Sequence, residues 1–309
     1  MRYRILLVIL ALAILIPSFS SAQRWKRMRY EWVGGVGASN FLGDLGGADQ
    51  IGTNYFKDLE FSMTRFVLSI GMRYRIKQKL AASVHLSYAM VSGNDNTTKE
   101  PSREYRNLSF RSTIFELAVQ IEPALVKETV GHRYRLKGVK GRRWLGINTY
   151  PFIGIGVFYF NPKAKYNGKW YALQPLRTEG QGEFKTRKKY SRFSVSIPVG
   201  IGFKYRYNRK WSIGFQYGLR KTFTDYIDDV STTYVDESYI RDATKGVNSD
   251  IAIALADRSE PVDSDDWRRT AAGQQRGDPT DKDSYMFAKI MVAYKFRVVK
   301  RRRRSRPKF

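Results

Sequence analysis

The stretch FVLSIGMRYRIKQKLAASVHLSYAM, residues 66–90, decides the fold. Every second residue of its first part is apolar: Phe66, Leu68, Ile70, Met72, Tyr74 and Ile76. After the polar residues 77–79 the alternation resumes with Leu80, Ala82, Val84, Leu86, Tyr88 and Met90. Because successive side chains of a strand point to opposite faces, each part has one apolar face and one small or polar face. Two such runs joined by a short polar turn predict a β-hairpin.

The same alternation predicts six further strands, at 30–38, 115–125, 147–160, 193–207, 211–219 and 286–296. The run 147–160 is apolar on both faces, so the pattern does not orient it. The chain has no cysteine, and no segment after the N-terminal apolar run reaches the roughly eighteen apolar residues of a spanning helix. An even number of strands of about ten residues predicts an all-β fold, an eight-stranded antiparallel transmembrane β-barrel. A soluble sandwich is the alternative, but the Gly, Ser and Ala on the polar faces favour a crowded barrel lumen.

The connections alternate between long and short. Four are long, at about 40–58, 92–112, 161–190 and 224–283, and two of the other three, 77–79 and 208–210, are short. The third is the basic connection 126–146, which the alternation assigns to the same side as the short turns. Short turns of outer-membrane barrels face the periplasm, which places both termini there. We expect interface aromatics on the periplasmic side at Tyr30, Trp32, Tyr74, Tyr205, Tyr207, Trp211 and Tyr294, and on the outer side at Tyr88, Phe158, Phe160 and Phe193.

The N-terminal segment predicts export. A basic start, the apolar run Ile5–Ile16 and small residues up to Ala22 are typical of a signal peptide, 1–22. A membrane anchor is the alternative, but the run is too short to span a bilayer. We therefore expect three parts: the signal peptide, an outer-membrane barrel at 23–296, and a basic periplasmic tail at 297–309.

The net charge of +27 would suggest nucleic acid. The topology instead assigns most of this charge to the periplasm, where chromosomal nucleic acid is absent. The tail holds eight Lys or Arg in thirteen residues. The tail either binds an anionic leaflet or an acidic protein, or is a solvated, disordered segment that binds no partner. The candidate partner interface is Arg133, Arg135, Lys137, Lys140, Arg142, Arg143, Arg209 and Lys210. Tyr294 and Phe296 end the last strand and are the candidate barrel-assembly signal.

Little in the sequence predicts catalysis. Of two histidines, His85 is expected in the lumen and His132 in a basic connection, which gives neither a catalytic triad nor a metal spacing. We expect no cofactor and no small-molecule substrate. The luminal carboxylates Glu116 and Glu122 are expected to pair with inward Arg65, Arg73, Arg75 or Arg192.

Two features of the last long connection are weaker signals. Its aspartates could bind calcium, although their spacing fits no defined calcium loop: Asp225, Asp228, Asp229, Asp263, Asp265 and Asp266. The tripeptide Arg276-Gly277-Asp278 is adhesion-like, but turn chemistry explains it better.

Several longer stretches carry a family resemblance. They are GASNFLGDLGG (37–47), RNLSFRSTIFEL (106–117), GIGVFYFNPKAKYNGKWYALQPLRTEGQG (154–182), RKTFTDYIDDVSTTYVD (220–236), ALADR (254–258) and QRGDP (275–279). In these stretches the chain resembles the PorG family of outer-membrane barrels, which belongs to the type IX protein secretion system of gliding and related bacteria. The resemblance implies a non-enzymatic component that associates with a periplasmic ring, built by a lipoprotein and its partner. The basic connection 126–146 and the tail go beyond the family pattern.

Three functions follow as hypotheses. The first is a structural and assembly component of the secretion machinery that docks the ring. The second is a passive outer-membrane surface barrel that binds ligands or adheres through its loops. The third is a membrane-embedded enzyme, against which the scarcity of histidine argues.

Overall fold

The computed structural model describes residues 28–45, 61–97, 100–126, 147–208, 210–244, 246, 248–259 and 270–297. Nine strands are formed within these ranges: β1 (Tyr30–Leu42), β2 (Arg65–Lys77), β3 (Leu80–Asn94), β4 (Ser109–Pro123), β5 (Ile147–Tyr166), β6 (Lys169–Ala172), β7 (Phe193–Arg206), β8 (Trp211–Thr222) and β9 (Ser284–Phe296). Three α-helices lie in the connections: α2 (Pro101–Arg106), α3 (Glu237–Thr244) and α4 (Ser249–Ala256).

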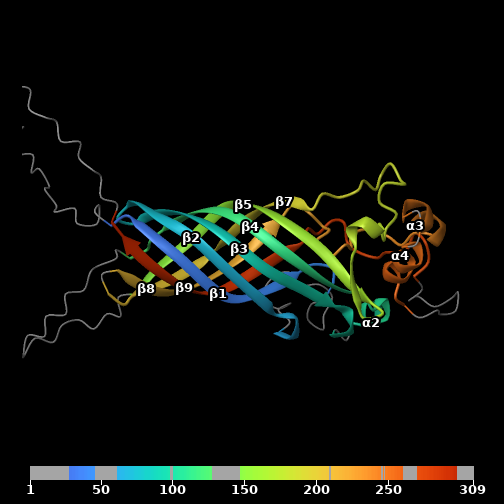
Figure 1. The fold of residues 1–309 in the computed structure, drawn as a ribbon, viewed down its shortest axis with the longest axis horizontal. Helices are drawn as coiled ribbons and strands as arrows, with labels where there is room; N and C mark the ends of the chain where they lie inside the picture. Colours follow the sequence, from blue (N-terminus) through green and yellow to red (C-terminus); the bar gives the residue numbers. More distant parts are fainter. Residues whose placement is uncertain are drawn as a thin grey trace, which may run out of the picture.

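Eight of these strands close into a barrel (Figure 1). Each pairs antiparallel with its sequence neighbours, and β1 pairs with both β2 and β9, which joins the first strand to the last. The short strand β6 pairs only with β5 and lies outside the ring. The predicted eight-stranded antiparallel barrel is therefore confirmed.

The outer wall of the barrel is apolar. The outward side chains of β7 are all exposed, from Phe193 to Tyr205, and Ile155 on β5 is 67% exposed. Ten residues at about 3.3 Å each, on a strand tilted by about 40°, rise about 25 Å, which is the height of the apolar band of a transmembrane barrel. An apolar outward face of this height is typical of side chains that face lipid. The fold is a transmembrane β-barrel.

Aromatic side chains border the apolar band at both ends. At one end Tyr30 stacks with Phe296, and Trp211 packs on Tyr294, with ring centroids 5.8 and 4.8 Å apart. At the other end the expectation was partly wrong, because Phe158 and Phe160 point into the lumen and are fully buried. The outward aromatics there are Phe66, Tyr88, Phe115, Tyr159 and Phe193.

Strand β5, which the sequence did not orient, is the longest strand, with twenty residues. Its outward residues include Ile153 and Val157, and its inward residues include Phe152 and Phe158. The strand continues past the barrel into a hairpin with β6. Asn167 and Gly168 turn this hairpin with φ of 46° and 82°, the conformation of a two-residue turn that Asn-Gly favours.

The two ends of the barrel differ (Figure 1). β1 begins and β9 ends at the same end, whereas α2, α3 and α4 lie beyond the opposite end. The turn between β2 and β3 is only Gln78 and Lys79. Several strands extend further toward the helical end than predicted, since β3 reaches Asn94 and β4 begins at Ser109. No helix in the described ranges is long and apolar enough to cross a membrane.

Candidate functional site

The lumen near the short turns is organised around Glu31, an inward residue of β1 that is 1% exposed. Its carboxylate is surrounded by four cations from three other strands. Arg73 and Arg75 of β2 lie 3.4 and 3.1 Å away, Lys204 of β7 lies 3.2 Å away, and Lys295 of β9 lies 3.6 Å away. One carboxylate therefore ties β1, β2, β7 and β9 together across the lumen. The alternation of 30–38 puts Glu31 on the face opposite Tyr30 and Trp32, but the pattern does not predict these four cations as its partners.

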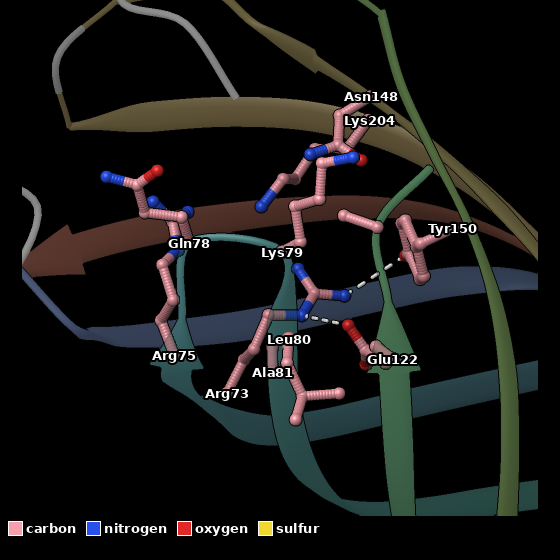
Figure 2. Close-up of a pocket in the computed structure, with 11 residues that line it drawn as sticks. Arg73, Arg75, Gln78, Lys79, Leu80, Ala81, Glu122, Asn148, Tyr150 and Lys204 are labelled. Carbon is pink, nitrogen blue, oxygen red and sulfur yellow. Dashed lines mark hydrogen bonds and ion pairs between the residues drawn. The ribbon is translucent and has the colours of Figure 1, made fainter. Parts of the chain in front are cut away.

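A second buried carboxylate, Glu122, lies beside this group (Figure 2). Arg73 forms an ion pair of 2.5 Å with Glu122 and donates a hydrogen bond to the Tyr150 hydroxyl at 3.0 Å. Ser83 donates to the other Glu122 oxygen at 2.5 Å, and His85 Nε2 lies 3.1 Å from Ser83 Oγ. This confirms the expected pairing of Glu122 with Arg73 and the luminal position of His85. His85 is 1% exposed, and its Nδ1 has no hydrogen-bond partner within the described residues, so the ring is packed inside the lumen.

A small recess that opens to solvent lies at this end of the lumen. Its wall includes Arg75, Lys79, Lys204 and Asn148, whose side chains Figure 2 shows around the opening. Within the described chain, the cations that line or act on this part of the lumen include Arg73, Arg75, Lys79, Lys204, Arg206 and Lys295, and the carboxylates there are Glu31 and Glu122. The mouth of the barrel therefore carries an excess of positive charge.

The middle of the lumen contains a second ion pair and an isolated cation. Arg220 of β8 lies 3.4 Å from Glu116, and both are 1% exposed. The prediction that Glu116 pairs with Arg65, Arg73, Arg75 or Arg192 is therefore wrong. Lys289 of β9 is equally buried, and its Nζ has no hydrogen-bond partner within the described residues.

Toward the helical end the lumen becomes apolar. Phe158, Phe160, Tyr285 and Phe287 fill it, and neighbouring rings lie 5.2 to 5.6 Å apart. These side chains form one hydrophobic cluster with Ile227 and other residues of the connections. The barrel is therefore filled along its described length, and this filling is unlike the water-filled lumen of a porin.

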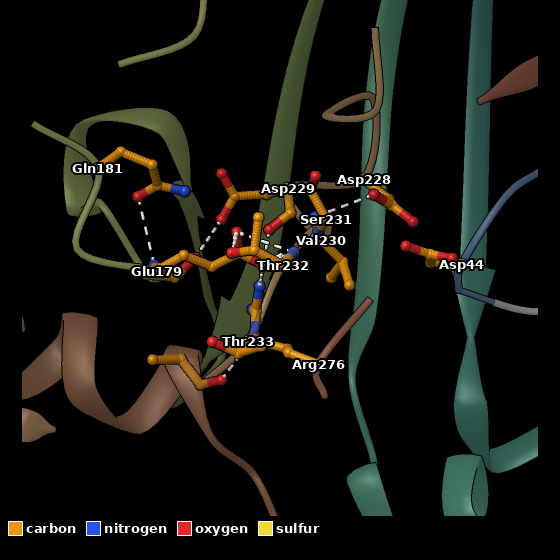
Figure 3. A network of polar contacts seen from close by, with 12 residues as sticks. Asp44, Glu179, Gln181, Asp228, Asp229, Val230, Ser231, Thr232, Thr233 and Arg276 are labelled. Carbon is orange, nitrogen blue, oxygen red and sulfur yellow. Dashed lines mark hydrogen bonds and ion pairs between the residues drawn. The ribbon is translucent and has the colours of Figure 1, made fainter. Parts of the chain in front are cut away.

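The long connections at this end fold into one structure, which we call the outer cap after the side of the membrane that the sequence predicts for it: residues 43–45, 61–64, 95–97, 100–108, 167–192, 223–244, 246, 248–259 and 270–283. Its centre is Arg276, which is 3% exposed (Figure 3). Arg276 donates to Glu179 at 2.9 Å, to the Asp229 carbonyl at 2.8 Å and to the Ala256 carbonyl at 3.1 Å. Arg276 and Gly277 of the tripeptide are thus buried in the cap, while Asp278 is half-buried; burial of the arginine argues against an adhesion motif.

A second arginine joins three connections. Arg106 forms a two-pronged pair with Asp95 at 2.8 and 2.9 Å. It also donates to the carbonyls of Asp44 and Arg276, at 2.7 and 2.6 Å. Because these partners come from different connections, Arg106 holds their backbones in a fixed arrangement.

The aspartates of the cap accept hydrogen bonds from backbone groups. Asp228 accepts from the amides of Leu45 and Val230, and Asp283 accepts from the amide of Ile227. Burial raises the pKa of Asp44 to about 6 and that of Asp225 to about 7, and a neighbouring negative charge adds to both shifts. Burial also raises the pKa of Asp228 and Asp283 well above the ordinary value.

These aspartates do not form a metal centre. Among the described residues no group of His, Asp or Glu side chains has an arrangement that could hold a metal ion. Asp225, Asp228 and Asp229 instead bind Ser231, Val230 and Thr178. The other predicted calcium candidates, Asp263, Asp265 and Asp266, lie outside the described residues.

Most of the predicted partner interface also lies outside the described residues, namely Arg133, Arg135, Lys137, Lys140, Arg142, Arg143 and Arg209. Lys210 is described and exposed, and its carbonyl accepts a hydrogen bond of 2.7 Å from the Lys295 amide. His132, the signal peptide 1–22 and residues 298–309 of the tail lie outside as well. Tyr294 and Phe296 lie at the end of β9, beside the aromatic residues of β8 and β1.

Comparison with known proteins gives a family. Residues 6–251 match the family described as "Domain of unknown function (DUF6089)". A search among curated proteins finds no match. Three solved structures of similar shape are Neisserial surface protein A, the attachment invasion locus protein Ail of Yersinia pestis in complex with the heparin analogue sucrose octasulfate, and the outer membrane protein OprG of Pseudomonas aeruginosa.

The identities to these three structures are 9%, 8% and 9%, and each TM-score is 0.35. The aligned regions cover 86%, 87% and 88% of this chain and 96%, 100% and 98% of the other chains. Values this low establish no shared function.

Proposed function

Because the chain belongs to the DUF6089 family and folds as a transmembrane barrel, we propose that it is a non-enzymatic structural component of the outer membrane. In this proposal residues 1–22 are a signal peptide, 23–296 form the barrel and 297–309 are a basic periplasmic tail. Short turns of such barrels face the periplasm. The outer cap then faces outside, and both termini are periplasmic.

One observation carries the proposal: a filled barrel with a cationic periplasmic mouth. The aromatic filling around Phe158 and Phe287 argues against a conduit. The mouth holds more cations than carboxylates within the described chain, and complementary charge steers and orients protein association. A periplasmic partner with an acidic face fits this end of the molecule.

The family resemblance suggests which partner this is. We propose the periplasmic ring proteins of the type IX protein secretion machinery, the lipoprotein and its partner. Outer-membrane lipid surrounds the barrel, and neither nucleic acid nor a small-molecule substrate has a role. The docking face consists of the basic connection 126–146 together with Lys210 and the recess beside Lys79.

The test is charge reversal on this face. The six Lys and Arg residues of 133–143 are replaced by Glu in the full chain, and the protein is purified from outer membranes. We expect the ring proteins that co-purify to decrease at least tenfold. Folding is checked by heat modifiability, the faster gel migration of an unheated barrel.

A matched control reverses six exposed cations of the opposite end: Lys169, Lys185, Lys188, Lys189, Lys221 and Arg241. This control should leave co-purification unchanged. Unchanged co-purification and normal secretion in the 133–143 variant would refute docking through this face.

The second candidate function is a passive surface barrel that binds ligands or adheres through its loops. The buried pair of Glu179 and Arg276 favours it, because a fixed cap presents a defined surface. Deletion separates the two functions. Loss of type IX substrate secretion supports the ring-docking component, whereas intact secretion supports the surface barrel.

A further inference from the structure

A group of cations lies on the membrane-facing wall beyond the aromatic residues at the helical end. Arg111 lies four residues from Phe115 on β4, and Lys163 lies four residues from Tyr159 on β5. Since four is an even number, each cation shares the outward face of its aromatic. Arg111 and Lys163 are direct partners in the β4–β5 ladder. Two residues further on, Lys165 faces Trp170 across the β5–β6 hairpin.

The aromatics mark where the apolar band ends. Rings of Phe66, Tyr88 and Phe115 follow one another at centroid distances of 5.7 and 4.8 Å, and Tyr159 and Phe193 lie 5.2 Å apart. Aromatic girdles of this kind lie at the membrane–water interface. Four residues along a strand tilted by about 40° rise about 10 Å, so Arg111 and Lys163 lie at the level of the lipid headgroups.

The positive charge of this wall is not neutralised by the described protein. No carboxylate of the described residues forms an ion pair with Arg111, Lys163 or Lys165. The Arg111 guanidinium instead lies 4.0 Å from the centroid of the Trp170 ring, which orients it. Arg258 adds a fourth cation, since it donates to the Lys165 carbonyl at 2.5 Å and to Ser109 Oγ at 2.9 Å.

The other side of the barrel shows a contrast. Lys221 lies on the outward face of β8 at the same end, but it pairs with Asp281 at 3.2 Å. On the outward strand faces at this end, the cations without an ion pair to a described carboxylate therefore include Arg111 on β4 and Lys163 and Lys165 on β5, with Arg258 beside them. We call Arg111, Lys163, Lys165, Trp170 and Arg258 the cationic wall.

We propose that the cationic wall binds the phosphate groups of the phosphorylated glycolipid that forms the outer leaflet of bacterial outer membranes. An occupant of this wall must border the lipid, because the wall continues the lipid-facing surface at the headgroup level. Guanidinium and ammonium groups are the side chains that recognise phosphate. The proposal rests on the proposed orientation, in which the outer cap faces outside.

The experiment uses the full chain, purified and folded in detergent, with native mass spectrometry as the readout. Lipid A is titrated, and dephosphorylated lipid A, phosphatidylglycerol and inorganic phosphate serve as comparison probes. The wall variant combines Arg111→Gln, Lys163→Gln and Lys165→Gln. The matched control combines Lys185→Gln, Lys188→Gln and Arg241→Gln, which removes three charges near α3, where Phe184 packs on Tyr239.

We expect the wall variant to bind lipid A at least tenfold more weakly than the parent, and the control to bind like the parent. Dephosphorylated lipid A should bind the parent as weakly as lipid A binds the wall variant. Equal affinity of the parent and the wall variant would overturn the proposal, as would an equal loss in the control. If the triple variant does not fold, Lys163→Gln and Lys165→Gln alone should each give a smaller loss.

The comparison probes separate this proposal from the proposed function. Phosphatidylglycerol that binds as tightly as lipid A, with the same loss in the wall variant, would overturn the glycolipid assignment and contradict the orientation. Full displacement of lipid A by inorganic phosphate would also overturn it. Failure of ring co-purification would refute the proposed partner but leave these lipid affinities unchanged.

Discussion

Arg276 donates a hydrogen bond of 2.9 Å to Glu179 across 97 residues of sequence, and both side chains are almost completely buried. Glu179 also accepts from the amide of Ser231 at 3.0 Å and from the hydroxyl of Thr232 at 2.7 Å. The pair thus joins the connection after β6 to both ends of the connection before β9. Breaking a buried pair by removing one partner leaves an uncompensated charge.

We expect Arg276→Met to destabilise the outer cap by roughly 3–5 kcal/mol while the barrel remains folded. Hydrogen exchange at the Ser231 and Thr232 amides should accelerate, and heat modifiability should persist. Arg241→Met is the control, because its pair with Asp250 is exposed, and such pairs contribute less than about 1 kcal/mol. Unchanged exchange in the Arg276 variant would show that the apolar cluster alone holds the cap.

The second prediction concerns Glu31, which faces four cations in the lumen. Glu31→Gln removes the negative charge that compensates them, and we expect a loss of roughly 3–5 kcal/mol in unfolding free energy. Urea unfolding in detergent micelles measures it. Glu183→Gln removes a carboxylate from a partly exposed pair with Arg177 and should cost less than about 1 kcal/mol. Similar losses of unfolding free energy in both variants would contradict the role of Glu31 in joining four strands of the barrel.

The third prediction is a stabilising substitution. The Lys289 ammonium is buried without a hydrogen-bond partner in the described chain, which is costly in the lumen. Lys289→Met keeps the length of the side chain, and we expect it to stabilise the barrel by about 1 kcal/mol or more. Lys204→Met is the control, because Lys204 pairs with Glu31, and this substitution should destabilise the barrel. If both variants were destabilised alike, Lys289 would have an essential electrostatic role.

The fourth prediction is the pH dependence of the outer cap. A carboxyl group with a raised pKa in the folded state binds more protons when folded than when unfolded, so stability falls as pH rises. Its pKa in the unfolded chain is about 3.9. In the cap it is about 6 for Asp44 and Asp229 and about 7 for Asp225. The stabilisation is therefore complete below about pH 4 and is lost as pH rises to about 7.

Hydrogen exchange in the cap, corrected for the intrinsic rate at each pH, measures this dependence. We expect stronger protection at pH 5 than at pH 8. Asp225→Asn removes one of the titrating groups and should flatten the change. Protection that increases toward pH 8 would show that these carboxylates are paired with cations more strongly than they are desolvated.

The positions of the barrel strands could be predicted from the sequence, because every lipid-facing residue of a strand must be apolar and these residues recur at every second position. The sequence could not orient β5 because the filling at the helical end is apolar too, so Phe152 and Phe158 resemble the lipid-facing residues. Glu122 and Arg73 were paired correctly, since they lie on β4 and β2, on either side of β3. The partner of Glu116 is Arg220, from the far side of the lumen, and that distance depends on the tilt and register of the closed barrel.

The contacts of the outer cap could not be predicted from the sequence, for another reason. The connections that hold Glu179, Asp229 and Arg276 have no hydrophobic periodicity. The spacing of these residues in the sequence therefore does not predict that they contact one another. One sign was available: Arg276 and Glu179 belong to two of the stretches that carry the family resemblance. The partner interface around residues 133–143 stays a prediction.

The last prediction concerns where the closing strand ends. Phe296 is the ladder partner of Tyr30, stacks on it at 5.8 Å, and stacks on Trp32 at 6.1 Å. Its neighbour Lys295 pairs with Glu31. A chain cut after Phe296 keeps all these contacts, so we expect a heat-modifiable barrel in the outer membrane. A chain cut after Val292 loses Lys295 and Phe296 together and should fail to assemble. If the longer chain also fails, residues after Phe296 contribute to the assembly signal.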